Sequence, residues 1–345
     1  MDERTHEAPT IDERKAEILR AIVENYVSSA QPVGSKTVAG SRDLGVSAAT
    51  IRNDMGALER EGYIVQPHTS AGRIPTDLGY RYYVDHLADP PVLAPPQRRE
   101  VANFFNSATR AMEDLLSETS QLLARVTAHA AVVIPPGAEV ERVRSVQLVA
   151  LQPDELLLVM VLSDGGIARE VVRLEHAVPE GDVAVATARL QAAWNGATVA
   201  TLPGIATAPP DDAVGLIVDA AVAAMARRAT DDPADVYVGG VHRLAVDIES
   251  FGSSDTAAHL LELLEQHVVL TALVRELLGP GLTIRIGAEN ERDDLRDCSL
   301  VLAPYLVEGE RAGTLGVLGP TRMDYRRATA AVEAVSRQLG RQLSR

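Results

Sequence analysis

The chain has 345 residues, 33 basic against 48 acidic side chains, a net charge of −15 and a single cysteine. One cysteine excludes a disulfide framework, and no uncharged apolar run reaches the ~20 residues that cross a bilayer, so we expect a cytoplasmic protein without membrane contact. The length predicts two or three domains, and the acidic start Met1-Asp2-Glu3-Arg4 has no signal-peptide pattern.

The first predicted element is a helix over residues 11–29. It is preceded by Thr10-Ile11-Asp12-Glu13, which matches a capping box with the Thr10 hydroxyl as the cap. The apolar positions Ile18, Ile22 and Val23 recur at helical spacing, so we expect this helix to pack on the elements that follow.

Residues 32–85 contain the most informative pattern. A short helix is predicted over 34–44, a turn at 45–46, a second helix over 47–61, and two strand-like runs within 62–76. Helix, turn, helix and β-hairpin in this order are typical of a winged helix-turn-helix, a module that reads DNA.

The second helix is the candidate reading helix. Ser47 is a natural N-cap, and the small Ala48 lets the helix terminus approach a groove floor. Thr50, Arg52 and Asn53 lie off the apolar stripe and carry donors and acceptors that suit base edges. An amphipathic helix with an ordinary solvated face is the alternative, and the attached turn and hairpin favour DNA.

The predicted hairpin and the short helix over 34–44 supply further candidate contacts to phosphate or the minor groove. Four lie around the hairpin tip and one lies on the short first helix: His68, Thr69, Ser70, Arg73 and Lys36. Gly72 is expected to supply the permissive backbone of the hairpin return. Thr76 should cap a last helix over 77–87, in which Tyr80 and Tyr83 are predicted core and hydrogen-bonding residues rather than stacking platforms for bases.

The acidic net charge does not exclude DNA binding, because charge acts where phosphate is met. Between Lys36 and Arg81 there are six basic and five acidic residues, so this module is nearly neutral. We therefore expect weak binding to non-specific DNA. Specific binding should depend on two modules acting together.

Beyond residue 88 the pattern changes to an α+β arrangement. A Pro-rich linker is expected over 89–100, then a long helix over 98–129. The predicted strands span 131–134, 143–151, 155–162, 167–174, 283–286, 299–307 and 314–318, and a helix over 324–343 closes the chain. Residues 179–254, with helices over 182–194 and 213–228 and a strand-like run over 236–248, are interpreted as an insertion into this sheet domain.

Apparent chemical motifs give weak signals. His259, Glu262 and His267 lack a third ligand at diagnostic spacing, so a solvated helix face is the better interpretation. The acidic group Asp293, Asp294 and Asp297 is interpreted as a loop, and Cys298 as a core residue. Nothing indicates a catalytic triad, so neither an enzyme nor a metal or other cofactor is predicted.

Glycines 313, 316 and 319 do not follow the spacing of a phosphate loop. They are interpreted as a sign of close packing between a strand and a helix.

Several blocks resemble a known family. The run Pro32–Asp85 is similar to the N-terminal domain of the HrcA family, bacterial repressors of heat-shock chaperone operons, through Ala49-Thr50-Ile51-Arg52-Asn53-Asp54, the segments 66–76 and 79–85, and Gly34-Ser35-Lys36. The segments 295–305 and 313–325 also resemble that family. Gly56 departs from the pattern of a good helix former and weakens the reading helix.

The resemblance implies a winged helix-turn-helix over 1–88, a GAF-like domain over 101–178 and 255–345, and an inserted dimerisation domain over 179–254. It implies a homodimeric repressor that binds double-stranded DNA at an inverted-repeat operator called CIRCE, upstream of chaperonin and DnaK-type operons, and that depends on the GroEL chaperonin for its active fold. The alternative is a winged-helix regulator whose GAF-like domain binds a small-molecule effector. An enzyme fused to a DNA-binding domain has little support.

Overall fold

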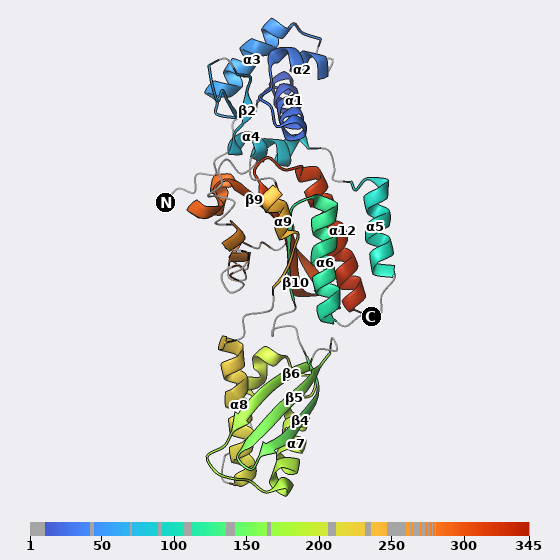
Figure 1. Ribbon diagram of the computed structural model, residues 1–345, viewed down its shortest axis with the longest axis vertical. Coiled ribbons are helices and arrows are strands. Elements are labelled where there is room, and N and C mark those ends of the chain that lie inside the picture. The colour runs from blue at the N-terminus through green and yellow to red at the C-terminus, as the bar shows by residue number, and fades with distance from the viewer. Residues whose placement is uncertain are drawn as a thin grey trace.

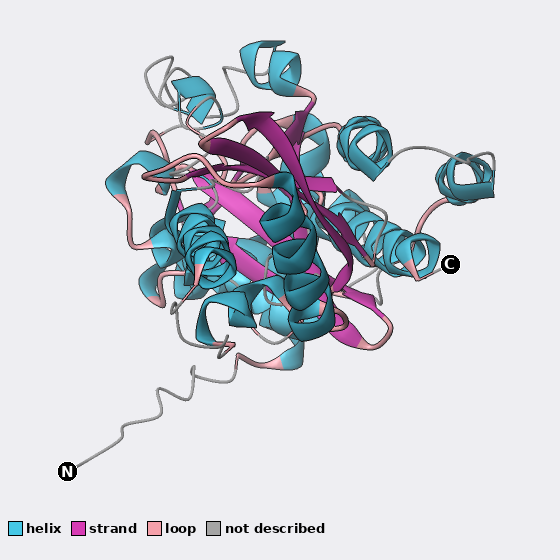
Figure 2. Ribbon diagram, turned by 90° about the horizontal axis from the view of Figure 1, so that it is seen from below, coloured by secondary structure: helices cyan, strands magenta, loops and turns pink. Residues whose placement is uncertain are grey.

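The computed structural model describes residues 11–41, 45–69, 71–88, 92–106, 112–135, 142–163, 167–205, 212–231, 236–246 and 281–344, with scattered positions between 260 and 279. These residues form three units arranged along the longest axis, which we call the N-terminal unit (11–88), the inserted unit (142–231) and the central unit (the remainder) (Figure 1). Seen along that axis, helices lie around a central group of strands (Figure 2). The fold is α+β, as predicted.

The N-terminal unit has the predicted order of helix, turn, helix and hairpin. Its elements are α1 (Glu13–Ser29), α2 (Ser35–Ser41), α3 (Ala48–Arg60), β1 (Ile64–Val65), β2 (Ile74–Pro75), α4 (Asp77–Tyr82) and the π-helical turn η1 (Tyr83–Leu87). Gly45 takes a φ of 64° in the turn between α2 and α3, a value that only glycine adopts without strain. Tyr80 and Tyr83 are buried, which confirms them as core residues. The predicted hydrogen bonding is wrong for Tyr80, whose buried hydroxyl has no partner among the described residues.

The predicted capping box of α1 is wrong. The N-cap is Asp12, whose carboxylate accepts a hydrogen bond from the Lys15 amide at 2.9 Å. With Asp12 as the cap, the third helical position is Lys15, which cannot complete a box as Glu would. Thr10 lies outside the described residues.

The predicted linker and the single long helix are both wrong in extent. Two helices occupy this region, α5 (Pro95–Asn106) and α6 (Met112–Thr127), and Leu93 is already buried. Pro95 and Pro96 begin α5 because the first turn of a helix has amides without helical partners, so proline loses nothing there. Proline enrichment marks a helix start here rather than a spacer.

The central unit contains a five-stranded antiparallel sheet in the order β7-β3-β10-β9-β8. The strands are β3 (Ala130–Ile134), β7 (Tyr237–Gly239), β8 (Thr283–Ile286), β9 (Cys298–Val307) and β10 (Glu310–Pro320). Helices α6 and α12 (Tyr325–Leu343) pack on one face, and a second cluster that includes Leu260, Leu264 and Leu273 covers the other. Cys298 is fully buried in that cluster, as predicted.

Two local predictions for the central unit are also wrong. The run 236–248 is not one strand, because β7 ends at Gly239, Gly240 takes a φ of 70°, and α9 (Val241–Val246) follows. A Cβ at Gly313 or Gly316 would overlap atoms of the neighbouring strands, so these glycines serve close approach within the sheet rather than between strand and helix. Short 3-10 turns η4 (Gly287–Asn290) and η5 (Asp293–Leu295) connect β8 to β9.

The inserted unit has its own sheet and core. Strands β4 (Val143–Gln152), β5 (Glu155–Leu162) and β6 (Ile167–Arg173) pair only with one another in the order β4-β5-β6. Helices α7 (Glu180–Trp194) and α8 (Ala213–Asp231), with the 3-10 turn η2 (Val199–Gly204), close a separate core around Trp194.

The predicted grouping of these three strands with the central strands is therefore wrong. Side chains in β5 alternate between buried and partly exposed, whereas most of β9 and β10 is continuously buried. Alternation fits a sheet covered on one face, and continuous burial fits a sheet covered on both. No helix in the described part of the chain is long and apolar enough to cross a membrane.

Candidate nucleic-acid interface

Helix α3 presents the predicted side chains to solvent. Ser47 is its N-cap, since the Ser47 hydroxyl accepts from the Thr50 amide at 3.2 Å and lies 3.1 Å from the Thr50 hydroxyl. Ile51, Met55 and Leu58 form the buried stripe. Arg52 and Asn53 are exposed, Ala48 and Thr50 are half-buried, and Ser47 is exposed. The predicted orientation of the helix is thus confirmed.

The carboxylates around α3 are paired with cations inside the N-terminal unit. Arg14 donates to Asp54 from two nitrogens, at 2.8 and 3.2 Å. Lys15 lies 3.1 Å from Glu61, and Arg73 lies 2.8 Å from Glu59. These acids are neutralised locally, while Arg52 remains on the exposed face, which favours an approaching polyanion. Sequence reasoning missed Arg14 and Lys15, because ion pairs across 40 or more residues leave no local pattern.

The hairpin is fastened at its tip and along its edge. The Gln66 amide donates to the Thr69 carbonyl at 3.0 Å and to the Ala71 carbonyl at 2.9 Å. Val33 and Arg73 exchange two backbone hydrogen bonds of 2.9 and 2.8 Å, so the segment before α2 adds a bridge beside β2. Gly72 has no positive φ, and a Cβ there would overlap the Val33 carbonyl. The need for glycine is therefore close approach, not a special turn conformation.

The hairpin candidates differ in how they are held. Arg73 is half-buried and its guanidinium is engaged by Glu59, so it fixes the hairpin to α3. His68 and Thr69 are exposed beside the tip, and Lys36 is exposed on α2. Ser70 lies outside the described residues.

The structure offers no metal centre among the residues that it describes. Glu262 is exposed and accepts from Gln266, while His259 and His267 lie outside the described residues. Asp293 pairs with Arg296 at 3.0 Å within an exposed turn. A hollow of about 210 Å³ between α5 and α12 is lined by Arg98, Arg337 and Arg341 together with apolar side chains.

Comparison with known proteins gives a consistent result. The family described as "HrcA protein C terminal domain" matches residues 113–329. The chain is 38% identical to the heat-inducible transcription repressor HrcA of Nocardia farcinica, covering 96% of this chain and 97% of the relative. It is 42% identical to the protein of the same name from Nocardioides sp., covering 96% and 98%.

Solved structures agree on the fold. A crystal structure described as a hypothetical protein has a TM-score of 0.62 at 23% sequence identity, covering 97% of this chain and 99% of that one. This likeness shows that the same fold extends over nearly the whole length.

Proposed function

This chain belongs to the HrcA family of heat-inducible transcription repressors, and we propose that it represses chaperone operons by binding a CIRCE-type inverted repeat as a dimer. It is a transcription repressor and not an enzyme. The observation that carries the proposal is the exposure of Arg52 and Asn53 on a capped helix whose carboxylates are ion-paired within the same unit.

In this proposal the N-terminal unit is a winged helix-turn-helix and α3 enters the major groove. Arginine can bind the two acceptors of guanine, and asparagine can bind adenine in the same two-point manner. The N-terminus of α3, with Ser47, Ala48 and Thr50, approaches a phosphate, since free helix amides attract anions. Lys36 and the hairpin residues His68, Thr69 and Ser70 contact the DNA backbone and hold the helix in register.

The dimer is proposed to form through the inserted unit. One face of the β4–β6 sheet is covered by α7 and α8, and the other is exposed and carries several apolar side chains beside Gln147, Arg169 and Arg173. Its exposed apolar side chains retain between 38% and 55% of their accessible surface and include Val149, Leu151, Val161, Ile167 and Val171. An apolar surface of this kind favours a protein partner, and a second copy would bring a second reading helix to the operator.

The structure also changes the proposed division of the chain. The inserted dimerisation domain is proposed over 142–231 instead of 179–254, because β4–β6 share a core with α7 and α8. The central unit, 92–135 with 236–344, is then the proposed GAF-like domain. Dependence on the GroEL chaperonin stays a prediction of the family resemblance, and a gel shift with and without GroEL tests it.

The test of DNA readout is a gel shift on an inverted-repeat operator and on a scrambled duplex of equal length. Arg52→Ala and Asn53→Ala should each lose roughly 1–3 kcal/mol on the operator and little on the scrambled duplex. Arg60→Ala is the matched control, because Arg60 is exposed at the other end of the same helix. Equal losses on both duplexes would mean that α3 does not read bases.

A further inference from the structure

The N-terminal unit is joined to the central unit by a set of directional hydrogen bonds. The Arg81 guanidinium on α4 donates from Nε to Glu289 at 2.8 Å, from a terminal nitrogen to the second Glu289 oxygen, and from the same nitrogen to the Ile284 carbonyl at 2.7 Å. This two-point pairing of a guanidinium with a carboxylate fixes an angle as well as a distance.

Neighbouring groups add to the same contact. The Asp77 carboxylate accepts from the Ala288 amide at 3.0 Å. Arg322, just before α12, donates to the Val27 carbonyl of α1 at 3.2 Å. Glu289 also accepts from the Ile286 amide at 2.9 Å, so the turn that receives α4 is itself held in shape.

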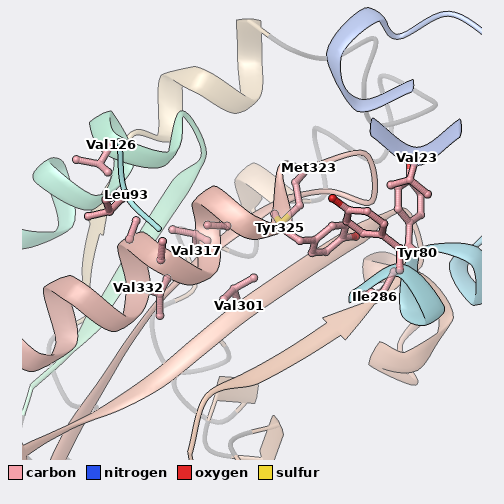
Figure 3. Packing of buried hydrophobic residues seen from close by; sticks show 14 of the residues in the cluster. Val23, Tyr80, Leu93, Val126, Ile286, Val301, Val317, Met323, Tyr325 and Val332 are labelled. Carbon is pink, nitrogen blue, oxygen red and sulfur yellow. The ribbon is translucent and has the colours of Figure 1, made fainter. Parts of the chain in front are cut away.

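Apolar packing runs through the contact without a break. Tyr80 of α4 and Tyr325 of α12 have ring centroids 5.7 Å apart, and Val23, Ile286 and Met323 lie around them (Figure 3). One buried cluster includes residues of α1, α3, α4, β9, β10 and α12. Reading helix and central sheet therefore share a core, and the segment between α4 and α5 is not what sets their relative position.

We propose that Arg81 and Asp77 are positioning residues that hold α3 at one orientation to the dimer and thereby determine which separation of operator half-sites the protein accepts. This inference rests on the proposed function. One base pair of added spacer rotates the half-sites by roughly 35°, because a turn of DNA has about 10.5 base pairs. A module on a flexible tether follows such a change, whereas a docked module follows it only by breaking the contact.

The first measurement needs no DNA. Hydrogen exchange of the peptide amides over 284–289 in full-length protein reports the docked state through Ala288, because this amide donates to Asp77 of α4. Arg81→Ala and the isosteric Glu289→Gln should each speed exchange at this amide at least tenfold. Asp85→Ala is the matched control, since it removes only the exposed partner that Arg81 has within the N-terminal unit, in the adjoining turn η1, at 3.2 Å. Unchanged exchange in both variants would overturn the inference.

The second measurement uses inverted repeats whose spacers differ in steps of one base pair. The unaltered protein and Asp85→Ala should prefer one spacer strongly, and the preference should fall at least tenfold in Arg81→Ala and Glu289→Gln. Faster exchange with an unchanged spacer preference would overturn the inference while leaving the proposed function in place. Failure of the unaltered protein to prefer any inverted repeat over scrambled DNA would overturn the proposed function itself, and this inference with it.

Discussion

The N-terminal unit and the inserted unit are attached to the central unit in opposite ways. The N-terminal unit shares a buried cluster with α12 and adds hydrogen bonds from Arg81 and Asp77. The inserted unit keeps a core of its own around Trp194 and leaves one apolar sheet face exposed. The N-terminal unit buries its apolar surface against the central unit, whereas the inserted unit leaves apolar side chains on one sheet face exposed.

This difference assigns the two units different tasks. A unit that shares a core is held in place, which suits an element that must present a helix at a set angle. A unit with a separate core and a solvent-exposed apolar face suits contact with another molecule. In the proposed function, orientation of the reading helix and assembly of the dimer are therefore handled by separate parts of the chain, and substitutions should separate them.

The largest expected effect on operator affinity comes from substitutions on the exposed face of the β4–β6 sheet. Ile167→Glu combined with Val171→Glu places two charges on exposed apolar positions of β6. We expect dissociation into monomers in sedimentation and a loss of operator affinity of about 100-fold or more, since the second module no longer binds with the first. The matched control is Val185→Glu with Leu216→Glu, which lie exposed on α7 and α8. If the β6 variant remains a dimer, this face is not the interface.

The structural features that could be predicted from the sequence are those that depend on residues close together in the chain. Ser47 was predictable as a cap because its partner lies three residues away. β5 was predictable as a strand because residues 156–162 form a short continuous apolar run. By contrast, Arg81 and Glu289 are separated by 208 residues, and no spacing rule connects them.

The same limit explains the error in grouping. A short apolar run predicts a strand but not which strands share its sheet, so β4–β6 were placed with the wrong partners. A DNA contact by Arg73 stays a prediction from its position in the hairpin, and its pairing with Glu59 could not be foreseen because it depends on how the hairpin folds back on α3. Gly72 was recognised as necessary, although the approach of Val33 could not be foreseen.

The next effect tests the docked unit. Gly287 takes a φ of 55° and faces the Asp77 carboxylate with no space for a Cβ, whereas Gly309 takes a φ of 87° in open space. Gly309→Ala should cost only the backbone strain, about 1–2 kcal/mol. Gly287→Ala should cost roughly 2–3 kcal/mol, because the Cβ also displaces the Asp77 carboxylate and breaks its hydrogen bond from Ala288.

Chemical denaturation with two probes measures this effect and sharpens the comparison. Trp194, the single tryptophan, reports the inserted unit, and far-UV circular dichroism reports the whole chain. Gly287→Ala should shift the dichroism transition and leave the Trp194 transition in place, because the two cores are separate. A parallel shift of both transitions would show that the inserted unit is coupled to the docked unit after all.

A smaller effect distinguishes the two tyrosines at the contact. The Tyr325 hydroxyl donates to the Thr321 carbonyl at 2.6 Å and lies 2.7 Å from the Ser299 hydroxyl. The Tyr80 hydroxyl is buried with no hydrogen-bond partner among the described residues. Tyr325→Phe should therefore destabilise by about 1–2 kcal/mol, and Tyr80→Phe should be neutral or stabilising by up to about 1 kcal/mol. Thermal denaturation compares them, and equal losses would show that Tyr80 has a polar partner.

The smallest effect concerns the charge of Asp77. Burial raises the pKa of the Asp77 carboxyl, and the nearby charges of Glu289 and Asp297 raise it further against the lowering effect of the Ala288 amide. Because the folded pKa of Asp77 lies above its unfolded pKa, this group contributes fully to folding stability at pH values below the unfolded pKa. That contribution is lost as the pH rises through the folded pKa. At neutral pH the charge on Asp77 therefore offsets part of the stability that its hydrogen bond from Ala288 contributes to the docked state. Asp77→Asn keeps an oxygen that can accept from Ala288 without the charge, so it should be slightly more stable than the unaltered protein at pH 7. That advantage should shrink as the pH falls through the folded pKa. Asp77→Ala, which loses the acceptor, should be less stable throughout the same series of thermal denaturations. A less stable Asn variant at pH 7 would show that the charge strengthens the hydrogen bond to Ala288 by more than its burial costs.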